Sequence, residues 1–532
     1  KDIAMQRIPP VPYQVVAIAP FAPSAALRLS RPYATDELDT ALNDLGAVFA
    51  VPVHRELFPP ARVEVPVRQL RDFRPDQIAR NVPGLTAYRE AAQHIRKALA
   101  RRVDPQDVYA EATGRWPALP IPPPPSSGEA AVARARSEAI DDIFSMVALP
   151  GTDAAPVAPS PADHHASTWP DQLDVLLGRI LSAVFADAGF RAAEAAWRGL
   201  ATLTRQGPFP LGDGLRFRIL PAAADSLADA LDLLVRELAA APPNLILVAL
   251  PFDSSPRSLE LLERAAGCAD ALQAPLVVEL ASAFFHLPSW PEITRLPHLP
   301  NYLEDAAFAK WRRLAEQPGG AWLTATCNPF AGREPHRSEL GHGIAACDET
   351  EPLWLNPAWA AGALAAQSVA RFGWPTHLAE WRQIALRGLP GIDTGDRPTP
   401  TAAVFPRERL QQFKAAGISP LAVEPGRIEA FLPHAVTVSG QRLEPALYLN
   451  RVVAFLIQLH EAAGTLPPGA VADEVAGALA LLFAAAGGGA PAELSVKAAA
   501  AASDGSIPLY IRLAPPAGVL PSAEPLEFTF TW

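Results

Sequence analysis

The stretch that decides the fold is FRAAEAAWRGL, residues 190–200, which closes a long amphipathic segment beginning near Trp169. Its large apolar residues recur at helical spacing, so it predicts a helix with one buried stripe. A similar stripe precedes it, and its members are Leu173, Leu176, Leu177, Ile180, Leu181, Val184 and Phe185. This i, i+3, i+4, i+7 spacing is that of an amphipathic helix. The segment 171–206 therefore predicts a pair of packed helices.

Downstream of this pair, apolar strands alternate with helices. Short apolar runs that predict buried strands lie at 215–220, 244–250, 275–280 and 321–327. The segments that predict helices lie between them, at 223–240, 256–272 and 308–316. Such alternation is typical of right-handed crossovers and of a mostly parallel, covered sheet. The expected fold class is therefore α/β.

Upstream, residues 1–116 predict a small α/β unit. Its elements are an apolar strand at 13–19, a helix at 36–45 and a second apolar run at 47–53. Residues 62–68 then alternate with the valines on one face, and Pro66 favours an edge position. In the string that follows, Asp72 can cap the turn after it, and Pro75 suits the first turn of a helix.

Proline-rich sequence separates the two regions. Residues 117–125 hold six prolines, and 150–161 is a second stretch of proline, alanine and serine, so both are expected to be extended. Between them, 129–147 has a short helical pattern. We therefore expect a linker over 117–168 and a larger α/β domain over 169–532.

Two short strands are expected at the end of the chain, because apolar and polar residues alternate there. The apolar members are Leu509, Ile511 and Leu513 in the first strand and Phe528, Phe530 and Trp532 in the second. A lone two-stranded hairpin is marginal in water, and an exposed apolar strand edge invites pairing with another chain. The pattern by itself favours packing of these strands on their own domain.

Composition narrows the functional classes. At 532 residues, 49% of them hydrophobic, the chain is too long for one core and can fill two or three. Its formal net charge of −11 argues against a nucleic-acid binder, which needs a surplus of lysine and arginine. There is no uninterrupted apolar run of about 18 residues and no signal-peptide core in residues 1–12. We therefore expect a cytoplasmic protein that does not insert into membranes.

The three cysteines, Cys268, Cys327 and Cys347, are odd in number and widely spaced. Such spacing is neither a disulfide framework nor a zinc pattern. We expect them to be reduced thiols that pack as small hydrophobic side chains.

Catalytic residues of an α/β protein are expected where strands end, because ligands of parallel sheets bind beyond the carboxyl ends of the strands. The residues found there are Asp253, Ser254, Ser282, Cys327 and Asn328. They match no phosphate loop, dinucleotide-binding fingerprint, nucleophile elbow or zinc-protease motif. Cys327 would need a histidine base to act as a nucleophile, and a buried inert thiol is the simpler interpretation.

Two other residue patterns suggest a metal site but lack the ligands that such a site requires. The pair His164 and His165 lies in the linker without further ligands, and His460 with Glu461 lacks the second histidine that a zinc site requires. The glycines at 487–489 are a helix terminator. We therefore expect no catalytic, cofactor-binding or metal-binding residues, and no enzyme.

Two motifs resemble those of a known family. The block 190–200 resembles the F-x-x-x-E-x-x-W-R-G-L signature of the large sheath subunit of bacterial type VI secretion systems; it is carried by Phe190, Glu194, Trp197, Arg198 and Gly199. The string at 70–85 resembles the D-F-x-P-D … V-P-x-L motif of the small sheath subunit; it is carried by Asp72, Phe73 and Pro75. The two subunits, usually separate chains, look fused head to tail here.

The resemblance continues along most of the chain. APLVVELASAFFHLPSW is similar to a strand and turn of the large subunit, and EPLWLNPAWAAGALAAQSVARFGW to its tryptophan-bearing helix. LQQFKAAGISPLAVEPGRIEAFLPHAVTV is similar to a late hairpin of that subunit. Each motif is loose, but their order is specific.

The resemblance implies a structural protomer of a contractile sheath in the bacterial cytoplasm. Such protomers polymerise with copies of themselves around an inner-tube protein, engage a baseplate, and eject the tube by contraction. The resemblance also implies intersubunit strand joints. Their residues would be Val15, Val16 and Ile18 near the start of the chain and Leu509, Ile511, Leu513, Phe528, Phe530 and Trp532 near its end.

Two other classes stay open. One is a non-contracting collar, cap or baseplate accessory module that reuses the sheath fold, since one fold serves several functions. The other, least favoured, is a small-molecule enzyme on an α/β sheet, which predicts a ligand near Asp253 or Cys327.

Overall fold

The structure is a computed structural model. It describes residues 11–23, 26–124, 169–207, 209, 214–337, 347–393, 397–464, 466–487, 489–503, 505–520 and 524–532. The helix expected at 129–147, the stretch 150–161 and the pair His164 and His165 lie outside these residues.

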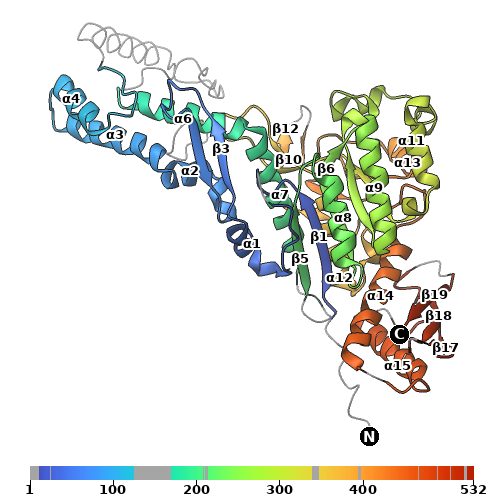
Figure 1. The fold of residues 1–532 in the computed structure, drawn as a ribbon. Coiled ribbons are helices and arrows are strands. Elements are labelled where there is room, and N and C mark those ends of the chain that lie inside the picture. Colours follow the sequence, from blue (N-terminus) through green and yellow to red (C-terminus); the bar gives the residue numbers. More distant parts are fainter. Residues whose placement is uncertain are drawn as a thin grey trace, which may run out of the picture.

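A seven-stranded sheet forms the centre of the fold, in the order β14-β8-β7-β6-β1-β5-β2 (Figure 1). Its strands are β1 (Tyr13–Ala19), β2 (Tyr33–Ala34), β5 (Leu215–Pro221), β6 (Leu245–Phe252), β7 (Leu276–Leu280), β8 (Leu323–Cys327) and β14 (Ile418–Pro420). All neighbours run parallel except β2, which is antiparallel to β5. The prediction of a mostly parallel α/β sheet is confirmed.

Helices cover both faces of this sheet, which explains why β7 is buried at every position. The helices α8 (Leu227–Leu238) and α9 (Pro256–Leu272) lie side by side on one face, and α7 (Ala188–Thr204) and α12 (Pro357–Phe372) pack together on the other (Figure 1). Helix α12 begins where the Asn356 side chain accepts a hydrogen bond from Ala358 N, with Pro357 in the first turn.

The first strand of the chain lies inside this sheet. β1 pairs with β5 over its whole length, from Tyr13 opposite Leu215 to Ala19 opposite Pro221, and its other edge pairs with β6. One hydrophobic core contains buried residues from both sides of the proline-rich stretch. The two regions expected at 1–116 and 169–532 therefore share one sheet and one core.

The rest of the N-terminal region, together with α6, forms an arm that leads away from the sheet (Figure 1). Its elements are α1 (Leu38–Leu45), β3 (Val48–Pro52), β4 (Arg62–Pro66), α2 (Pro75–Asn81), α3 (Pro83–Ala100), α4 (Pro105–Arg115) and α6 (Asp171–Ala186). β3 and β4 form an antiparallel hairpin, and α3 packs along α6. Trp169, just before α6, donates its indole N–H to Pro122 O at 2.7 Å.

A C-terminal unit packs beside the base of the sheet (Figure 1). It consists of α14 (Glu444–Ala463), α15 (Val471–Ala486), β17 (Glu493–Ala498), β18 (Pro508–Ala514) and β19 (Leu526–Thr531). Its three strands form an antiparallel sheet in the order β17-β18-β19, and the unit has a hydrophobic core of its own.

Short elements complete the described chain. The strands are β9 (Phe330–Arg333), β10 (Leu353–Leu355), β11 (Leu386–Arg387), β12 (Ile392–Asp393), β13 (Pro398–Thr399), β15 (Ala422–Val423) and β16 (Glu429–Phe431). The α-helices are α10 (Leu299–Tyr302), α11 (Ala309–Glu316) and α13 (Arg407–Ala415). The 3-10 helices are η1 (Thr35–Glu37), η2 (Leu70–Phe73), η3 (Ser282–Phe285), η4 (Trp290–Arg295), η5 (Ala306–Phe308), η6 (Pro318–Ala321) and η8 (Pro375–His377).

Within the described part of the chain, none of the helices is long and apolar enough to cross a membrane.

Candidate assembly interface

The motif at 190–200 lies on α7 and faces inward. The ring of Phe190 packs against Phe49, Phe73 and Phe185, with ring centres 5.4, 5.3 and 5.5 Å away. Phe73 belongs to the second family-like motif, so the two motifs touch each other. The aromatic residues of α7 thus hold the N-terminal arm to the main sheet.

Glu194 is the centre of a buried arginine–glutamate cluster, formed by Arg191, Glu194, Arg198, Arg333 and Glu349. Its Oε1 accepts from Arg333 Nε and Arg198 Nε, both at 2.8 Å, and its Oε2 accepts from Arg333 Nη2 at 2.8 Å. The side chain of Glu194 is 0% exposed. Burial raises the pKa of Glu194, but hydrogen bonds and charge from Arg333 and Arg198 outweigh it and hold the pKa below its ordinary value.

Trp197 and Gly199 complete the inward face of the motif. The indole N–H of Trp197 donates to Phe21 O at 3.0 Å, and the two rings are 4.8 Å apart. A Cβ at Gly199 would overlap the ring of Trp359 on α12. Glycine is thus required here for the close approach of α7 and α12.

Replacing Gly199 by alanine is expected to destabilise the fold by about 1–3 kcal/mol, because the added methyl group must push α7 and α12 apart. The matched control is Gly114→Ala on α4, where a Cβ meets nothing within 4 Å. The midpoints of thermal unfolding of the two variants would be compared. Equal midpoints would contradict a tight α7–α12 contact.

The second motif also has a structural role, with one difference from its prediction. Phe73 is buried and Pro75 occupies the first turn of α2, as expected. Asp72, however, does not cap the turn after it: its Oδ2 accepts from the preceding backbone N–H groups of Arg68 and Gln69, at 2.9 and 3.1 Å. The carboxylate therefore closes the turn that leaves β4.

The residues expected to form an intersubunit joint near the start of the chain, Val15, Val16 and Ile18, lie on an inner strand of the central sheet. These residues lie on β1 and are at most 1% exposed. Both edges of β1 are paired within the same chain, with β5 and with β6. In this arrangement β1 has no free edge to offer a neighbouring subunit, because parallel pairing has used its backbone groups on both sides.

The first C-terminal strand is likewise an inner strand. Leu509, Ile511 and Leu513 on β18 are buried in the core of the C-terminal unit. β18 pairs with β17 on one side and β19 on the other. These three residues thus hold the small sheet on its own unit.

The second C-terminal strand, β19, is an edge strand. Phe528 and Phe530 pack partly buried against the unit's core, and Trp532 is 8% exposed with its ring 4.8 Å from that of His460. Among the described residues no strand pairs with the outer side of β19 or of β17. Unpaired backbone N–H and C=O groups on such edges are a template for another chain.

The outer face of the same sheet carries charged side chains beside the exposed Tyr510. Arg512 on β18 lies between two carboxylates, with Nε 2.8 Å from Glu493 Oε1 and Nη1 2.6 Å from Glu527 Oε1. All three side chains are well exposed, so the ion pairs contribute little to stability. They do mark this face as solvated, which leaves the strand edges as the places for contact.

The candidate catalytic residues are spread over the carboxyl edge of the main sheet. Cys327 and Asn328 are fully buried, and Asn328 Nδ2 donates to Ala403 O and Leu421 O, both at 2.8 Å. Burial raises the pKa of the Cys327 thiol well above its ordinary value. Both side chains are therefore enclosed by the protein interior, and a ligand cannot reach the Cys327 thiol.

The structure brings Ser254 to His286, a contact that sequence reasoning missed. Ser254 Oγ lies 3.0 Å from His286 Nε2, and His286 Nδ1 lies 2.9 Å from the Tyr302 hydroxyl. Asp253 instead accepts from Ser255, and Ser282 is in η3. The contact is exposed, and a tyrosine takes the place where a catalytic pair has a carboxylate.

Among the described residues no group of three or more histidine, cysteine or carboxylate side chains could hold a metal ion. His460 packs on Trp532, and the cysteines Cys268, Cys327 and Cys347 are buried free thiols.

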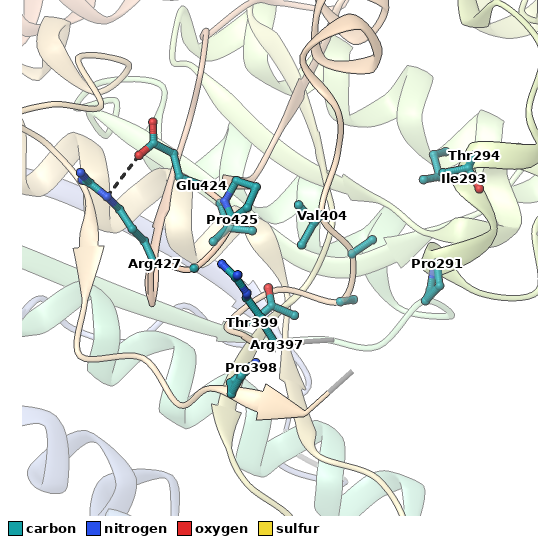
Figure 2. A pocket seen from close by; sticks show the side chains of 14 residues that line it. Pro291, Ile293, Thr294, Arg397, Pro398, Thr399, Val404, Glu424, Pro425 and Arg427 are labelled. Carbon is teal, nitrogen blue, oxygen red and sulfur yellow. Dashed lines mark ion pairs between the residues drawn. The ribbon is translucent and has the colours of Figure 1, made fainter. Parts of the chain in front are cut away.

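A cavity of about 480 Å³ lies between the β12–β13 hairpin and the loop after β15. Figure 2 shows the side chains that line it. Glu424 and Arg427 form an ion pair at 3.2 Å on its wall, while Val404 is 42% exposed. The lining contains no histidine, cysteine or serine, so it offers no nucleophile with a base.

Arg451 on α14 is a further organising residue that the sequence did not indicate. It is 2% exposed, and its guanidinium donates to Val11 O and Pro12 O at 2.8 and 2.9 Å. Burial lowers the pKa of Arg451 to about 10. This side chain ties the C-terminal unit to the segment that enters β1.

Comparisons with known proteins bear on the middle of the chain. Residues 236–432 match the VipB family, described as EvpB/VC_A0108, tail sheath N-terminal domain. This segment contains β6, β7, β8, α12 and the cavity of Figure 2. Among curated proteins, none matches the chain in sequence.

Solved structures with a similar fold are distant. A chain of the cryo-EM structure of the anti-feeding prophage baseplate is 14% identical, with 63% of this chain and 78% of that chain covered and a TM-score of 0.35. A chain of the anti-feeding prophage helical sheath in the contracted state is 14% identical, with 60% and 77% covered and a TM-score of 0.35. The sheath tail protein of Desulfitobacterium hafniense is 11% identical, with 57% and 59% covered and a TM-score of 0.29.

At these identities and TM-scores the solved structures support no conclusion about this chain. The sequence match extends over a continuous segment that includes four neighbouring strands of the central sheet, β14, β8, β7 and β6. The match of residues 236–432 to the tail-sheath family therefore supports a sheath protein with a structural role.

Proposed function

We propose that this chain is a structural protomer of a contractile-injection sheath of the type VI secretion kind. Protomers polymerise around an inner tube, and contraction of the polymer drives the tube outward. The tail-sheath match over residues 236–432 supports this proposal. The observation that carries it is the open outer edge of β19 on the C-terminal sheet.

The pairing of β19 with β18 determines which of its backbone groups are available. Ile507 and Trp532 exchange two backbone hydrogen bonds, each at 2.9 Å. In an antiparallel pair such residues alternate with residues whose N–H and C=O point away from the partner. Phe530 therefore bonds to β18, whereas Thr529 and Thr531 direct their backbone groups to the open edge.

A strand from a neighbouring subunit would use these outward groups. Main-chain hydrogen bonds would then provide the affinity, as in other cases of strand addition. The exposed charges of Glu493, Arg512 and Glu527 keep the flat outer face of the sheet in solvent. Assembly would therefore extend the sheet sideways through its edge and would not stack one sheet on another.

The finer parts of the proposal follow from the motifs. Residues 1–116 would correspond to a small sheath subunit, 117–168 to a linker and 169–532 to a large subunit, in one chain. The contact between Phe73 and Phe190 is the kind that would join the two subunits. The partners would be other copies of the chain, an inner-tube protein and a baseplate, in the bacterial cytoplasm, with no catalytic step in the protomer itself.

The test replaces one outward-facing residue of β19. Thr529→Pro removes an N–H from the open edge without removing a bond to β18, so the unit is expected to stay folded. The matched control, Thr529→Ala, keeps that N–H. We expect tubes or stacked rings for the unaltered chain and for Thr529→Ala, and dispersed protomers for Thr529→Pro, in negative-stain electron microscopy.

Deletion of residues 524–532 should also prevent assembly, but it uncovers the core of the C-terminal unit. Thr529→Pro is the stricter experiment, provided that its circular dichroism matches that of the unaltered chain. Tubes formed equally well by Thr529→Pro would rule out the β19 edge as the joint. Dispersed protomers for all variants, with an inner-tube protein present, would count against self-assembly altogether.

A further inference from the structure

Glu279 is a buried carboxyl group that the sheath role does not use. It is the fourth residue of β7, near the carboxyl end of the strand, and is 6% exposed. No ion pair or hydrogen bond to a charged group reaches it among the described residues. The Asn356 amide at the start of α12 and the Cys327 thiol on β8 are the polar groups that face it.

A cavity of about 340 Å³ opens beside this carboxyl group. It lies where the strand ends of the sheet meet α7 and α12, and its walls include Trp354 and Trp359 as well as small alanine side chains. Its volume is in the range of small-molecule sites in proteins. Glu279 and Asn356 are the polar side chains that line it, apart from the indole groups.

The sheet itself is irregular at this point. The register between β6 and β7 shifts between Val248 and Pro251, so that Val248 is opposite Val278 but Pro251 is opposite Glu279. The inserted residues, Ala249 and Leu250, line the cavity. Bulges of this kind re-aim side chains and are common beside binding sites.

The Asn356 amide and the Glu279 carboxyl group meet at the site, and in the described part of the chain neither has a charged partner. The Nδ2 of Asn356 is buried without a hydrogen-bond partner, while its Oδ1 accepts from Ala358 N at 2.9 Å. A carboxylate without a charged partner is costly to bury, and burial accordingly raises the pKa of Glu279 to about 8, while the adjacent Asn356 side chain lowers it. A cationic ligand would supply the missing partner.

We propose that this cavity binds an organic cation, with an alkylammonium or alkylguanidinium group on Glu279 and its alkyl part between Trp354 and Trp359. The carboxylate and the cation satisfy each other by a charge-assisted hydrogen bond. Tryptophan is the side chain whose ring attracts cations most strongly, and it also covers the alkyl chain. The alanine walls leave the room that such a chain needs.

The probe is n-butylguanidinium, which keeps its charge at every pH used. A ligand of this size is expected to bind with a Kd on the order of 1 mM. Isothermal titration calorimetry on the full chain should give binding about tenfold tighter at pH 9 than at pH 7, because the Glu279 carboxyl becomes ionised between them. The neutral n-pentanamide, of similar size, should bind no more tightly at pH 9.

Glu279→Gln should remove both the pH dependence and most of the affinity for the cation. Glu90→Gln, an exposed position on α3, serves as the matched control and should change neither. Circular dichroism confirms that each variant is folded. Binding that is unchanged in Glu279→Gln, that is equal for the cation and the neutral amide, or that is not detected at either pH would overturn the proposal.

The same probe identifies the source of the natural cation. If a basic side chain of a neighbouring subunit occupies the cavity, both n-butylguanidinium and Glu279→Gln should reduce the assembly seen by electron microscopy. If the ligand is a free small molecule, assembly should be unchanged while calorimetry still detects binding. Because calorimetry does not require polymers, failure of this site and failure of the proposed sheath function are distinguishable.

Discussion

Replacing Glu194 by alanine is expected to lower the free energy of unfolding by about 3–5 kcal/mol. The change leaves Arg333 with one carboxylate partner, Glu349, where it had two, and leaves Arg198 without its partner on α7. The side chain of Arg333 is only 10% exposed, so water cannot replace the lost carboxylate. Urea unfolding followed by tryptophan fluorescence would measure the loss, in the Thr529→Pro background so that assembly does not contribute.

The control for this prediction is Glu90→Ala, which removes an exposed carboxylate from α3 and should change the stability by less than about 0.5 kcal/mol. The pH dependence gives a second check. Because the pKa of Glu194 is held below its ordinary 4.5, its contribution is present above that pH and is lost as the pH falls through the lowered pKa. A Glu194→Ala variant as stable as its control would show that the cluster does not hold α7 to β9.

The unaltered chain is expected to become less stable as the pH rises, and Glu279→Gln is expected to remove this pH dependence. Burial raises the pKa of Glu279 to about 8 from an ordinary 4.5, so the folded chain holds this proton where the unfolded chain has released it. The stabilisation is complete below about pH 4.5 and is lost as the pH rises through about 8. The full difference is on the order of 5 kcal/mol.

This prediction is measured as a difference between two proteins. Urea unfolding of the unaltered chain and of Glu279→Gln would be compared at pH 5 and at pH 8.5. From pH 5 to pH 8.5, the free energy of unfolding of Glu279→Gln should rise by several kcal/mol relative to that of the unaltered chain. The free energy of unfolding of Glu90→Gln should not change relative to that of the unaltered chain. A constant difference across this range would contradict a buried, unpaired carboxyl group and would weaken the cation site with it.

The elements of the central sheet could be predicted from the sequence because each depends on a local pattern. Apolar runs indicated β5, β6, β7 and β8, and helical spacing indicated α7, α8 and α9. The place of β1 could not be predicted, since its pairing with β5 joins residues about two hundred positions apart. β17 was missed because Leu494 and Val496 are its only large apolar residues, and both are only partly buried.

The roles of single polar residues were harder to predict. The spacing of Glu194 and Arg198 on one helix is visible in the sequence, but Arg333, the main partner, comes from β9. Asp72 was expected to cap the turn that follows it in the sequence. Its carboxylate instead accepts hydrogen bonds from the turn that precedes it, because a carboxylate can reach backbone N–H groups on either side. Glu279 is an ordinary residue in an apolar run, and only the packing around it reveals that it is buried without a charged partner among the described residues.

The position of β1 has a consequence for biosynthesis. Its two neighbours, β5 and β6, are translated long after it, so the middle of the sheet cannot close until the ribosome has passed residue 252. Pairing between such distant segments is slow, and an unpaired apolar strand is prone to aggregate in the meantime. The segment Tyr13–Ala19 therefore stays without its strand partners until β5 and β6 have both been synthesised.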